Sequence, residues 1–442
     1  MAVRSPSSRR VKPPARPEVS DSAGSRTRDW TFTSVYALGF LTLVSTLNYF
    51  DRSVLSLMLP LIKKDFHVSD TVLGVVTGLI AIYAILGVPV AWLAERWSRR
   101  NIVAIGLAFW SLMTGLTGMV TSVWQLGGTR FAMAIGESAG LAPSQSILSD
   151  LFSRRARPLV LSIITTASSI ALLVYSPAAG WLAGHYGWRT VFLVAGAPGI
   201  VLAVVMLLTI REPGRHAAAE RIKAAPLGEA LAFLGGSKAF LWCLLGTSIM
   251  GVYLYGVSAW DVSFLVRVRH LSVPQVGAIF QPIRGAVSAI GIVLGGLLSS
   301  RLEAIDGRWR CWIPGLACLL MAPFQFIYLF SDSAPVWISS YAAAALFSIM
   351  HQGPIYAVYV SVAQARSRAV AVSVALLGAT VVGQFGGPIL IGWLNDQMHA
   401  HFGEGAIRYS MLVVMACSAL AGLCYLVAAR YVRADTERAA EA

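Results

Sequence analysis

The sequence has 442 residues, of which 56% are hydrophobic and only 13% are charged, with a formal net charge of +14. A water-soluble protein of this length would carry more charge on its surface, so the composition excludes an ordinary soluble globular protein. A basic balance is also found in nucleic-acid-binding proteins, but the positions of the basic residues argue against a nucleic-acid partner here.

Apolar stretches recur along the whole chain, and each is long enough to cross the roughly 30 Å hydrocarbon core of a bilayer. Several exceed the ~20 residues that a crossing needs, so these helices should tilt or extend beyond the bilayer. We therefore predict an all-α integral membrane protein. Its twelve transmembrane helices are expected at about 33–61, 71–93, 102–120, 125–152, 159–184, 190–210, 238–266, 275–300, 312–330, 336–363, 369–397 and 409–432.

The basic residues follow a one-sided pattern. If the N-terminus is cytoplasmic, 26 of the 35 Lys and Arg residues lie in or beside cytoplasmic segments and six in or beside external ones. This bias is the positive-inside signature, so both termini are expected in the cytoplasm. The charge then orients the protein, and contact with anionic membrane lipid is a secondary use. The Ala/Arg-rich ends favour a bacterial inner membrane as the location.

Polarity divides the chain into five parts. Residues 1–29 are polar and rich in Ser, Pro and Arg, which predicts a disordered cytoplasmic tail. Two six-helix bundles follow, at 30–210 and 238–432. A hydrophilic cytoplasmic linker, 211–237, joins them, and residues 433–442 form a second cytoplasmic tail.

The two bundles repeat one another. At a spacing of 211 residues, Pro143, Arg157, Ser162 and Pro177 are matched by Pro354, Arg368, Ser373 and Pro388. Parallel six-helix repeats are typical of secondary transporters, whose substrate path lies between the halves near the bilayer midplane. The matched prolines should kink or hinge their helices. The sequence holds no Walker-type phosphate loop, HExxH or nucleophile elbow, so we expect neither an enzyme nor an ATP-driven pump, and no metal or cofactor.

Four charged residues lie at bilayer depth, where a charge costs roughly 2.5–3.5 kcal/mol. At ~1.5 Å per residue from the outer end of each helix, Asp51 lies roughly 15 Å deep, Glu137 roughly 18 Å and Arg284 roughly 14 Å. Arg52 follows Asp51, and successive residues of a helix do not face each other, so each needs a partner on another helix. They either form structural ion pairs or line a functional cavity, and we favour the cavity.

Proton coupling is the chemistry that this cluster suggests. Arg52 is the closer partner of Glu137 by depth, and Arg130 lies two turns away on the same face as Glu137. An arginine that approaches or leaves a carboxylate changes the affinity of that carboxylate for a proton. We therefore predict that Asp51 and Glu137 couple transport to protons, with Arg52 and Arg130 setting their proton affinities.

Other polar residues are candidates for binding and gating. The expected substrate contacts are Arg52, Arg284, His351, Tyr83, Tyr356 and Tyr359. For His351 a buried histidine satisfied by a neighbour is an equal alternative, and for the tyrosines the alternative is packing. The expected cytoplasmic gate of ion pairs between loops comprises Glu95, Arg99, Arg100, Asp150 and Arg157, with ordinary positive-inside charge as the alternative. Asp261, near the outer end of its helix, is expected as a charge on the outer rim.

Several segments resemble a known family. ERWSRR (95–100) resembles the loop signature G-x-x-x-D-R-x-G-R-R of the major facilitator superfamily, with Ala91, Glu95 and Ser98 as departures. RFAMAIGESAG (130–140) resembles the arginine motif in the fourth helix of that superfamily. LNYFDR, GES and SDLFSRRAR are similar to the spinster subfamily. The resemblance implies a twelve-helix alternating-access transporter. It also implies sphingosine-phosphate or lysophospholipid substrates and proton coupling.

Three hypotheses follow. The first is a monomeric secondary transporter of an amphipathic lipid, with Arg52 and Arg284 binding the head group. The second is a transporter of a small organic anion or drug that uses the same arginines. The third is a non-transporting receptor, which Asp51 and Glu137 disfavour because a receptor needs no titrating carboxylate. An affinity that rises steadily with lipid tail length would separate the first hypothesis from the second.

Overall fold

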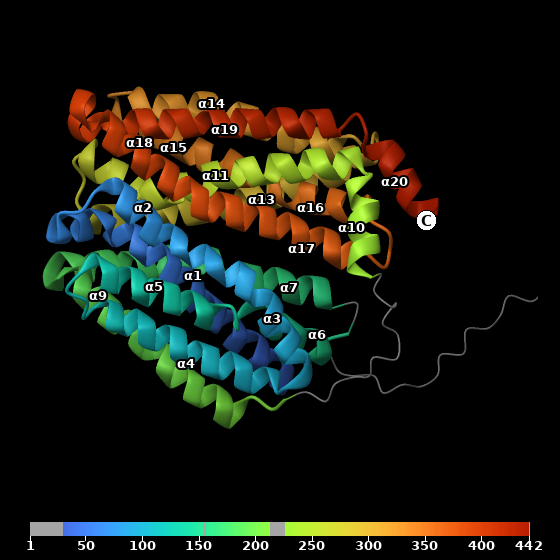
Figure 1. Cartoon of the computed structure of the whole chain (residues 1–442), viewed down its shortest axis with the longest axis horizontal. Helices are drawn as coiled ribbons and strands as arrows, with labels where there is room; N and C mark the ends of the chain where they lie inside the picture. The colour runs from blue at the N-terminus through green and yellow to red at the C-terminus, as the bar shows by residue number, and fades with distance from the viewer. Residues whose placement is uncertain (1–29, 154–155, 213–225, 442) are drawn as a thin grey trace, which may run out of the picture.

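The computed structural model describes residues 30–153, 156–212 and 226–441. Within these ranges all regular secondary structure is helical, which confirms the predicted fold class (Figure 1). The tail predicted to be disordered, residues 1–29, lies outside the described residues, as does the middle of the linker.

The first half contains the helices from α1 to α9, and most of them lie within the predicted apolar stretches. Their bounds are α1 Phe32–Phe66, α2 Asp70–Gly78, η1 Leu79–Ala81, α3 Ile82–Arg96, α4 Arg99–Thr117, α5 Val123–Glu137, α6 Leu141–Leu151, α7 Arg157–Thr165, α8 Ala167–Ile170, η2 Ala171–Tyr175 and α9 Ser176–Thr209.

The second half begins after the short helix α10 (Leu227–Gly235), which lies within the predicted linker. Its helices are α11 Lys238–Arg267, α12 Val273–Gln275, η4 Val276–Phe280, α13 Gln281–Glu303, α14 Trp309–Phe330, α15 Ala334–Ile349, α16 Gln352–Ser361, α17 Arg368–Gly378, η5 Ala379–Phe385, α18 Gly386–Phe402, η6 Gly403–Gly405, α19 Ala406–Ala428 and α20 Val432–Glu441. The expected tail 433–442 is thus helical over its described part.

The described helices make twelve passes, six in each half, because several passes are built from two to four consecutive helices. Six continuous helical segments are apolar and long enough to cross a membrane, and two of them, of 51 and 61 residues, turn back within their length. In the first of these, the chain turns inside α9 at Gly187, whose φ of +81° a residue with a side chain rarely adopts.

Prolines explain where passes are interrupted. Each of three π-helical turns, η2, η4 and η5, ends two or three residues before a proline: Pro177, Pro282 and Pro388. Proline lacks the N–H that a regular helix would donate four residues back, and a wider turn accommodates the loss. Because Pro177 and Pro388 are one of the repeated pairs, the same interruption occurs in both halves. The prediction that these prolines distort their helices is confirmed.

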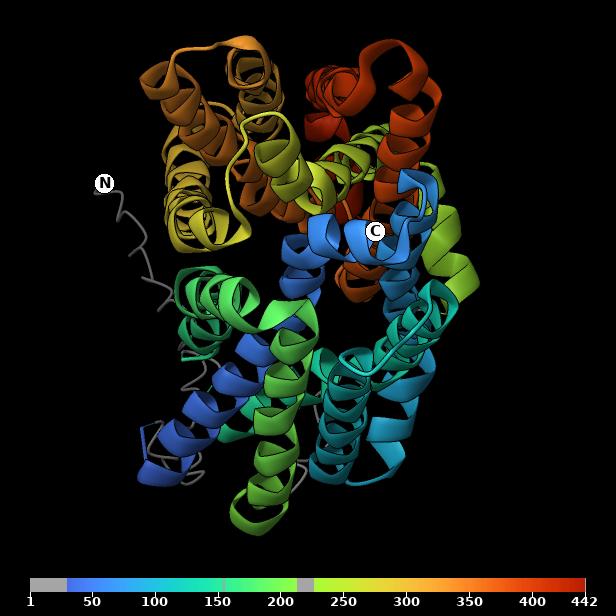
Figure 2. The ribbon, with the colours of Figure 1, turned by 90° about the vertical axis from the view of Figure 1, so that its left-hand side faces the viewer.

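The two halves pack against each other mainly at one end of the bundle. We call the end that carries the start of α1 and helix α20 the terminal end. At the opposite end, α2 lies on α18 and α9 lies on α12 and η4 (Figure 2). A Cβ added to Gly74 or Gly392 would lie 2.5 or 2.3 Å from a backbone oxygen of the other half, so glycine permits this approach. At the terminal end, the described residues of α6 and α7 make no extensive contact with α10, α16 or α17.

Candidate functional site

The deepest charged cluster lies between α1 and α5. Arg52 Nε donates a hydrogen bond to Glu137 Oε2 at 2.9 Å. The Glu137 side chain is fully buried, whereas 21% of the Arg52 side chain is exposed. The partnership expected from depth is therefore present. Its arginine remains accessible to a molecule that enters between the halves.

Asp51 faces a different set of residues. It is buried, and its carboxylate is hydrogen-bonded to Thr114. Arg130 Nη1 lies 3.5 Å from the Asp51 carbonyl oxygen, and its Nη2 donates to Thr117 Oγ1 at 2.9 Å. Asp51 Oδ1 and Glu137 Oε1 are buried and accept no hydrogen bond from the described residues. The adjacent residues Asp51 and Arg52 thus have separate partners, as helix geometry requires.

Tyrosines from both halves surround the Arg52 guanidinium. Its Cζ lies 3.9 Å from the centre of the Tyr83 ring and 6.0 Å from that of Tyr49. From the second half, Tyr255 lies close enough to interact electrostatically with Arg52, and Tyr356 with Tyr83. The ion pair therefore lies where the two halves meet. Tyr49 and Tyr255 were not predicted, although Tyr49 belongs to the LNYFDR segment.

Two expected substrate contacts lie elsewhere, inside the second half. Tyr359 shares a 2.6 Å hydrogen bond with Thr247 Oγ1, which also lies 3.2 Å from the Tyr425 hydroxyl. His351 Nδ1 lies 2.9 Å from the Ser348 carbonyl oxygen, and its ring stacks on Tyr425. This geometry corresponds to the alternative left open for His351, a buried histidine satisfied by a neighbour.

Asp261 and Arg284 form a second buried pair, between α11 and α13. Arg284 Nη1 lies 3.7 Å from Asp261 Oδ2. Asp261 is only 2% exposed, and the Tyr328 hydroxyl donates to its Oδ1 at 2.6 Å. The expectation that Asp261 is an outer-rim charge is therefore wrong. Asp261 does lie near the end of α11, but aromatic side chains of α14 and α15 cover it.

The residues expected to form a gate at the terminal end contact partners within the first half. Arg99 Nη1 lies 2.5 Å from Asp150 Oδ2, and Arg99 Nε lies 3.0 Å from Glu212 Oε1. Arg157 Nε donates to the Phe152 carbonyl oxygen at 3.2 Å. The side chain of Glu95 lies outside the described residues.

Glu212, just after α9, is the centre of this group and was not predicted. It accepts hydrogen bonds from Arg100 N at 2.9 Å and from the Ser98 hydroxyl at 2.7 Å. Burial alone would raise the pKa of Glu212, but the hydrogen bonds from Arg100, Ser98 and Arg99 outweigh it and hold the pKa below its usual value. The carboxylate thereby joins the start of α4 to the end of α9.

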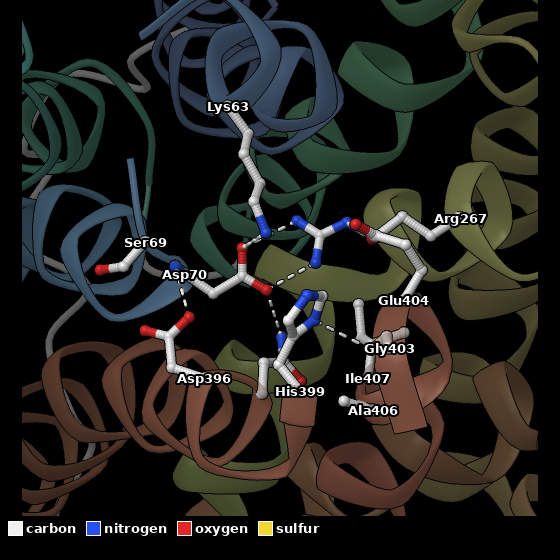
Figure 3. A pocket seen from close by; sticks show the side chains of 11 residues that line it. Lys63, Ser69, Asp70, Arg267, Asp396, His399, Gly403, Glu404, Ala406 and Ile407 are labelled. Atoms are coloured by element: carbon white, nitrogen blue, oxygen red, sulfur yellow. Dashed lines mark hydrogen bonds and ion pairs between the residues drawn. The ribbon is translucent and has the colours of Figure 1, made fainter. Parts of the chain in front are cut away.

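A second network, which joins the two halves at the opposite end, centres on Asp70 at the start of α2 (Figure 3). The Asp70 carboxylate receives Arg267 Nη1 at 2.5 Å and Nη2 at 2.9 Å. Lys63 Nζ lies 2.7 Å from it, and Asn395 Nδ2 donates to it at 3.0 Å. Arg267 and Asn395 belong to the second half, so Asp70 ties the halves together.

Asp396 adds to this Asp70 network from α18. It accepts hydrogen bonds from the backbone N–H groups of Asp70 and Thr71 at 3.0 and 2.8 Å, and from the Thr71 hydroxyl at 2.5 Å. A carboxylate from one half thus stabilises the N-terminus of a helix in the other, where the helix dipole favours negative charge. The network lines a cavity of about 320 Å³. None of these residues was predicted, because their significance depends on contact between the halves.

Among the described residues, no group of three or more His, Cys, Asp or Glu side chains is arranged to hold an ion.

Comparisons with known proteins agree with this architecture. The profile of the Major Facilitator Superfamily matches residues 41–387. An MFS-type efflux pump of Mycolicibacterium smegmatis is 31% identical over 407 residues, which cover 91% of this chain and 94% of the pump. Human protein spinster homolog 1 is 26% identical over 442 residues, which cover 92% of this chain and 82% of the human protein.

A solved structure gives the same result for the fold. It is that of a bacterial homolog of the human lysosomal transporter spinster, in an inward-facing and unoccupied conformation. The TM-score is 0.82 at 26% sequence identity, and the match covers 92% of this chain and 99% of the other.

Proposed function

Because the chain belongs to the major facilitator superfamily and is a spinster-like membrane transporter, we propose that it moves an amphipathic anion by proton-coupled alternating access. The observation that carries this proposal is the Arg52–Glu137 pair, which lies between the halves among tyrosines of both. A cation beside aromatic rings suits a substrate with an anionic head and an apolar body.

The conformation supports alternating access. The bias of Lys and Arg places both termini in the cytoplasm. The Asp70 network and the close glycine contacts then close the external side, so this state is open to the cytoplasm. The similarity to a structure described as inward-facing supports the same assignment. Transport requires that the external contacts break while the cytoplasmic ends of the two halves come together.

Proton coupling follows from how the carboxylates are paired. Glu137 remains ionised while Arg52 lies 2.9 Å away. When substrate draws Arg52 away, the buried Glu137 loses its counter-charge, and binding a proton removes the cost of an unpaired buried anion. Asp51 has an oxygen without a hydrogen-bond donor among the described residues, and Arg130, which lies 3.5 Å from the Asp51 backbone carbonyl oxygen, is the cation that would set its proton affinity. These four residues form the proposed proton-coupling site.

Substrate binding involves both halves. Arg52, Tyr83 and Tyr356 form the part of the site that lies between the halves. Arg284 adds a second cation from the second half, while His351 and Tyr359 support the wall behind it. At the cytoplasmic end, Arg99, Arg100, Asp150 and Arg157 hold the loops of the first half in place, ready to meet the second half on closure. We place this carrier as a monomer in a bacterial inner membrane.

A second candidate, transport of a drug or small organic anion, is favoured by the relative described as an efflux pump. A binding experiment separates the two on purified protein. Lysophosphatidate with 10-, 14- and 18-carbon tails, a small dicarboxylate and a cationic dye would be titrated in parallel. We expect affinity for lysophosphatidate to rise with tail length. Tighter binding of the dye or the dicarboxylate, with no dependence on tail length, would contradict the lipid assignment.

A further inference from the structure

The second buried pair, Asp261 and Arg284, has a longer N···O distance than the other ion pairs of the described residues. Arg284 Nη1 lies 3.7 Å from Asp261 Oδ2, which is beyond hydrogen-bonding distance. Within the described residues the Arg284 guanidinium makes no hydrogen bond, although it has five N–H donors. By contrast, Arg267 and Asp70 in the same protein form a two-point pair at 2.5 and 2.9 Å.

The space around the pair can accept a small polar group. Asp261, Arg284, Gln325 and Tyr328 line a cavity of about 20 Å³, enough for one water molecule. Gln325 is 2% exposed, its Oε1 accepts from the Tyr253 hydroxyl at 3.1 Å, and its Nε2 has no partner among the described residues. The cavity therefore holds two unsatisfied donor groups, a guanidinium and an amide, beside a single carboxylate.

The Arg284 end of this site lies beside the interface between the halves. Of the Arg284 side chain, 17% is exposed. The next residue, Gly285, packs against the first half, since a Cβ added there would meet Leu172 at 3.0 Å and Ser169 at 3.3 Å. A substrate between the halves can therefore present an anionic group to Arg284 without entering the core of the second half.

We propose that Asp261 is an internal anion that occupies Arg284 in the empty carrier, and that the anionic group of the substrate displaces it and leaves Asp261 to take up a proton. The inference rests on the proposed function, because it assumes an anionic substrate. Phosphate, sulfonate or carboxylate oxygens would accept two N–H groups of Arg284 and the Nε2 of Gln325, which Asp261 does not reach.

The proton requirement follows from the surroundings of Asp261. The groups that face it are Arg284 from α13, Tyr328 from α14 and Tyr341 from α15, and the Tyr253 hydroxyl of α11 lines the same cavity. Arg284 is the only cation among them. Once the substrate binds Arg284, the buried Asp261 carboxylate has only neutral hydroxyl groups around it, and binding a proton removes its charge. Binding of the anion is thereby linked to uptake of a proton in the second half, separately from Asp51 and Glu137.

Decyl sulfonate is a suitable probe, because it stays ionised at all relevant pH values, and decanol is its neutral counterpart. Affinity would be measured by calorimetry on the full chain in lipid nanodiscs. We expect decyl sulfonate to bind more tightly than decanol, and Asp261→Asn to bind it several-fold more tightly than the parent, because the internal competitor is gone. Arg284→Ala should weaken it about tenfold or more. Unchanged or weaker affinity in Asp261→Asn, or no saturable binding to the parent, would overturn the proposal.

Proton uptake supplies the second test. An indicator dye in weak buffer would report protons taken up when decyl sulfonate binds to the Asp51→Asn, Glu137→Gln double variant. The two proposed coupling carboxylates of the first half are absent there, so the uptake that is lost when Asp261→Asn is added reports Asp261. Absence of uptake in the double variant would refute a linked proton at Asp261. That result would not bear on Asp51 and Glu137, whose role is tested separately by a flux assay. Asp65→Asn, which removes a carboxylate that pairs with Arg189 outside this cavity, guards against a folding artefact and should retain the uptake.

Discussion

Asp70→Asn should open the external side of the carrier. The substitution keeps the size of the side chain but removes the charge that receives two Arg267 contacts and one from Lys63. The positive charges of Arg267 and Lys63 would then repel each other, because no anion would lie between them. Contacts of this kind contribute roughly 1.5–3 kcal/mol each, but water partly replaces them when the halves separate. We expect a shift of about 1–3 kcal/mol, which changes the ratio of the two conformations about 5- to 150-fold.

Spin labels would measure this shift as a distance. Trp124 lies in the first turn of α5 in the first half and is 83% exposed, and Ser333 precedes α15 in the second half at the same end. Labels on cysteines at these two positions, in a variant without the five native cysteines, should show a longer distance population in Asp70→Asn. The control is Asp65→Asn, because Asp65 pairs with Arg189 at 2.6 Å within the first half and both side chains are 40% exposed. Identical distributions for the parent and Asp70→Asn, or an equal change in the control, would refute the role of Asp70 in closing the halves.

Three further outcomes are expected. Gly392→Val should also favour the externally open state, because a Cβ at this position would lie 2.3 Å from a backbone oxygen of α2. The control is Gly39→Ala: nothing lies within 4 Å of a Cβ added there, so the spin-label distances should not change. Tyr83→Leu removes the ring that lies 3.9 Å from Arg52 and should weaken lysophosphatidate binding a few-fold in titrations, since a cation–π contact contributes about 0.5–2 kcal/mol. Glu212→Gln should lower the free energy of unfolding by less than about 1 kcal/mol, because the site is partly exposed, and the melting temperature should fall slightly. Since the folded pKa of Glu212 is lowered, its stabilisation is present above the ordinary carboxyl pKa of about 4.3 and is lost as the pH falls below it, so parent and variant should converge in melts at acidic pH.

Much of the central cluster could be predicted, because charge at bilayer depth is rare enough to be noticed. The depth of each residue along its helix predicted the pairing of Arg52 with Glu137 correctly. Helix geometry predicted correctly that Asp51 and Arg52 have different partners. The same count was misleading for Asp261, because depth along one helix does not show how side chains of other helices enclose a residue. That enclosure depends on Tyr328, whose position follows from packing alone.

The residues that join the two halves could not be found from the sequence. Asp70 precedes an apolar stretch and resembles an ordinary residue of a helix N-terminus, and Asp396 lies 326 residues away in the chain. Their contact exists only when the external ends of the halves meet, so it is a property of one conformation. The only sign of Glu212 in the sequence is an acidic residue soon after the predicted helix 190–210. Its partners, at residues 98–100, lie three predicted helices earlier in the chain.

The central claim, proton-coupled transport through Asp51 and Glu137, is tested most directly by flux in proteoliposomes under an imposed pH gradient. Labelled lysophosphatidate would be followed for the parent, Asp51→Asn and Glu137→Gln, with gradients of either sign and with none. The account predicts that the gradient drives accumulation in the parent, that neither variant responds to it, and that both still exchange substrate without a gradient. Parent-like rates and an unchanged pH response in both variants would contradict the account and leave these carboxylates with a purely structural role.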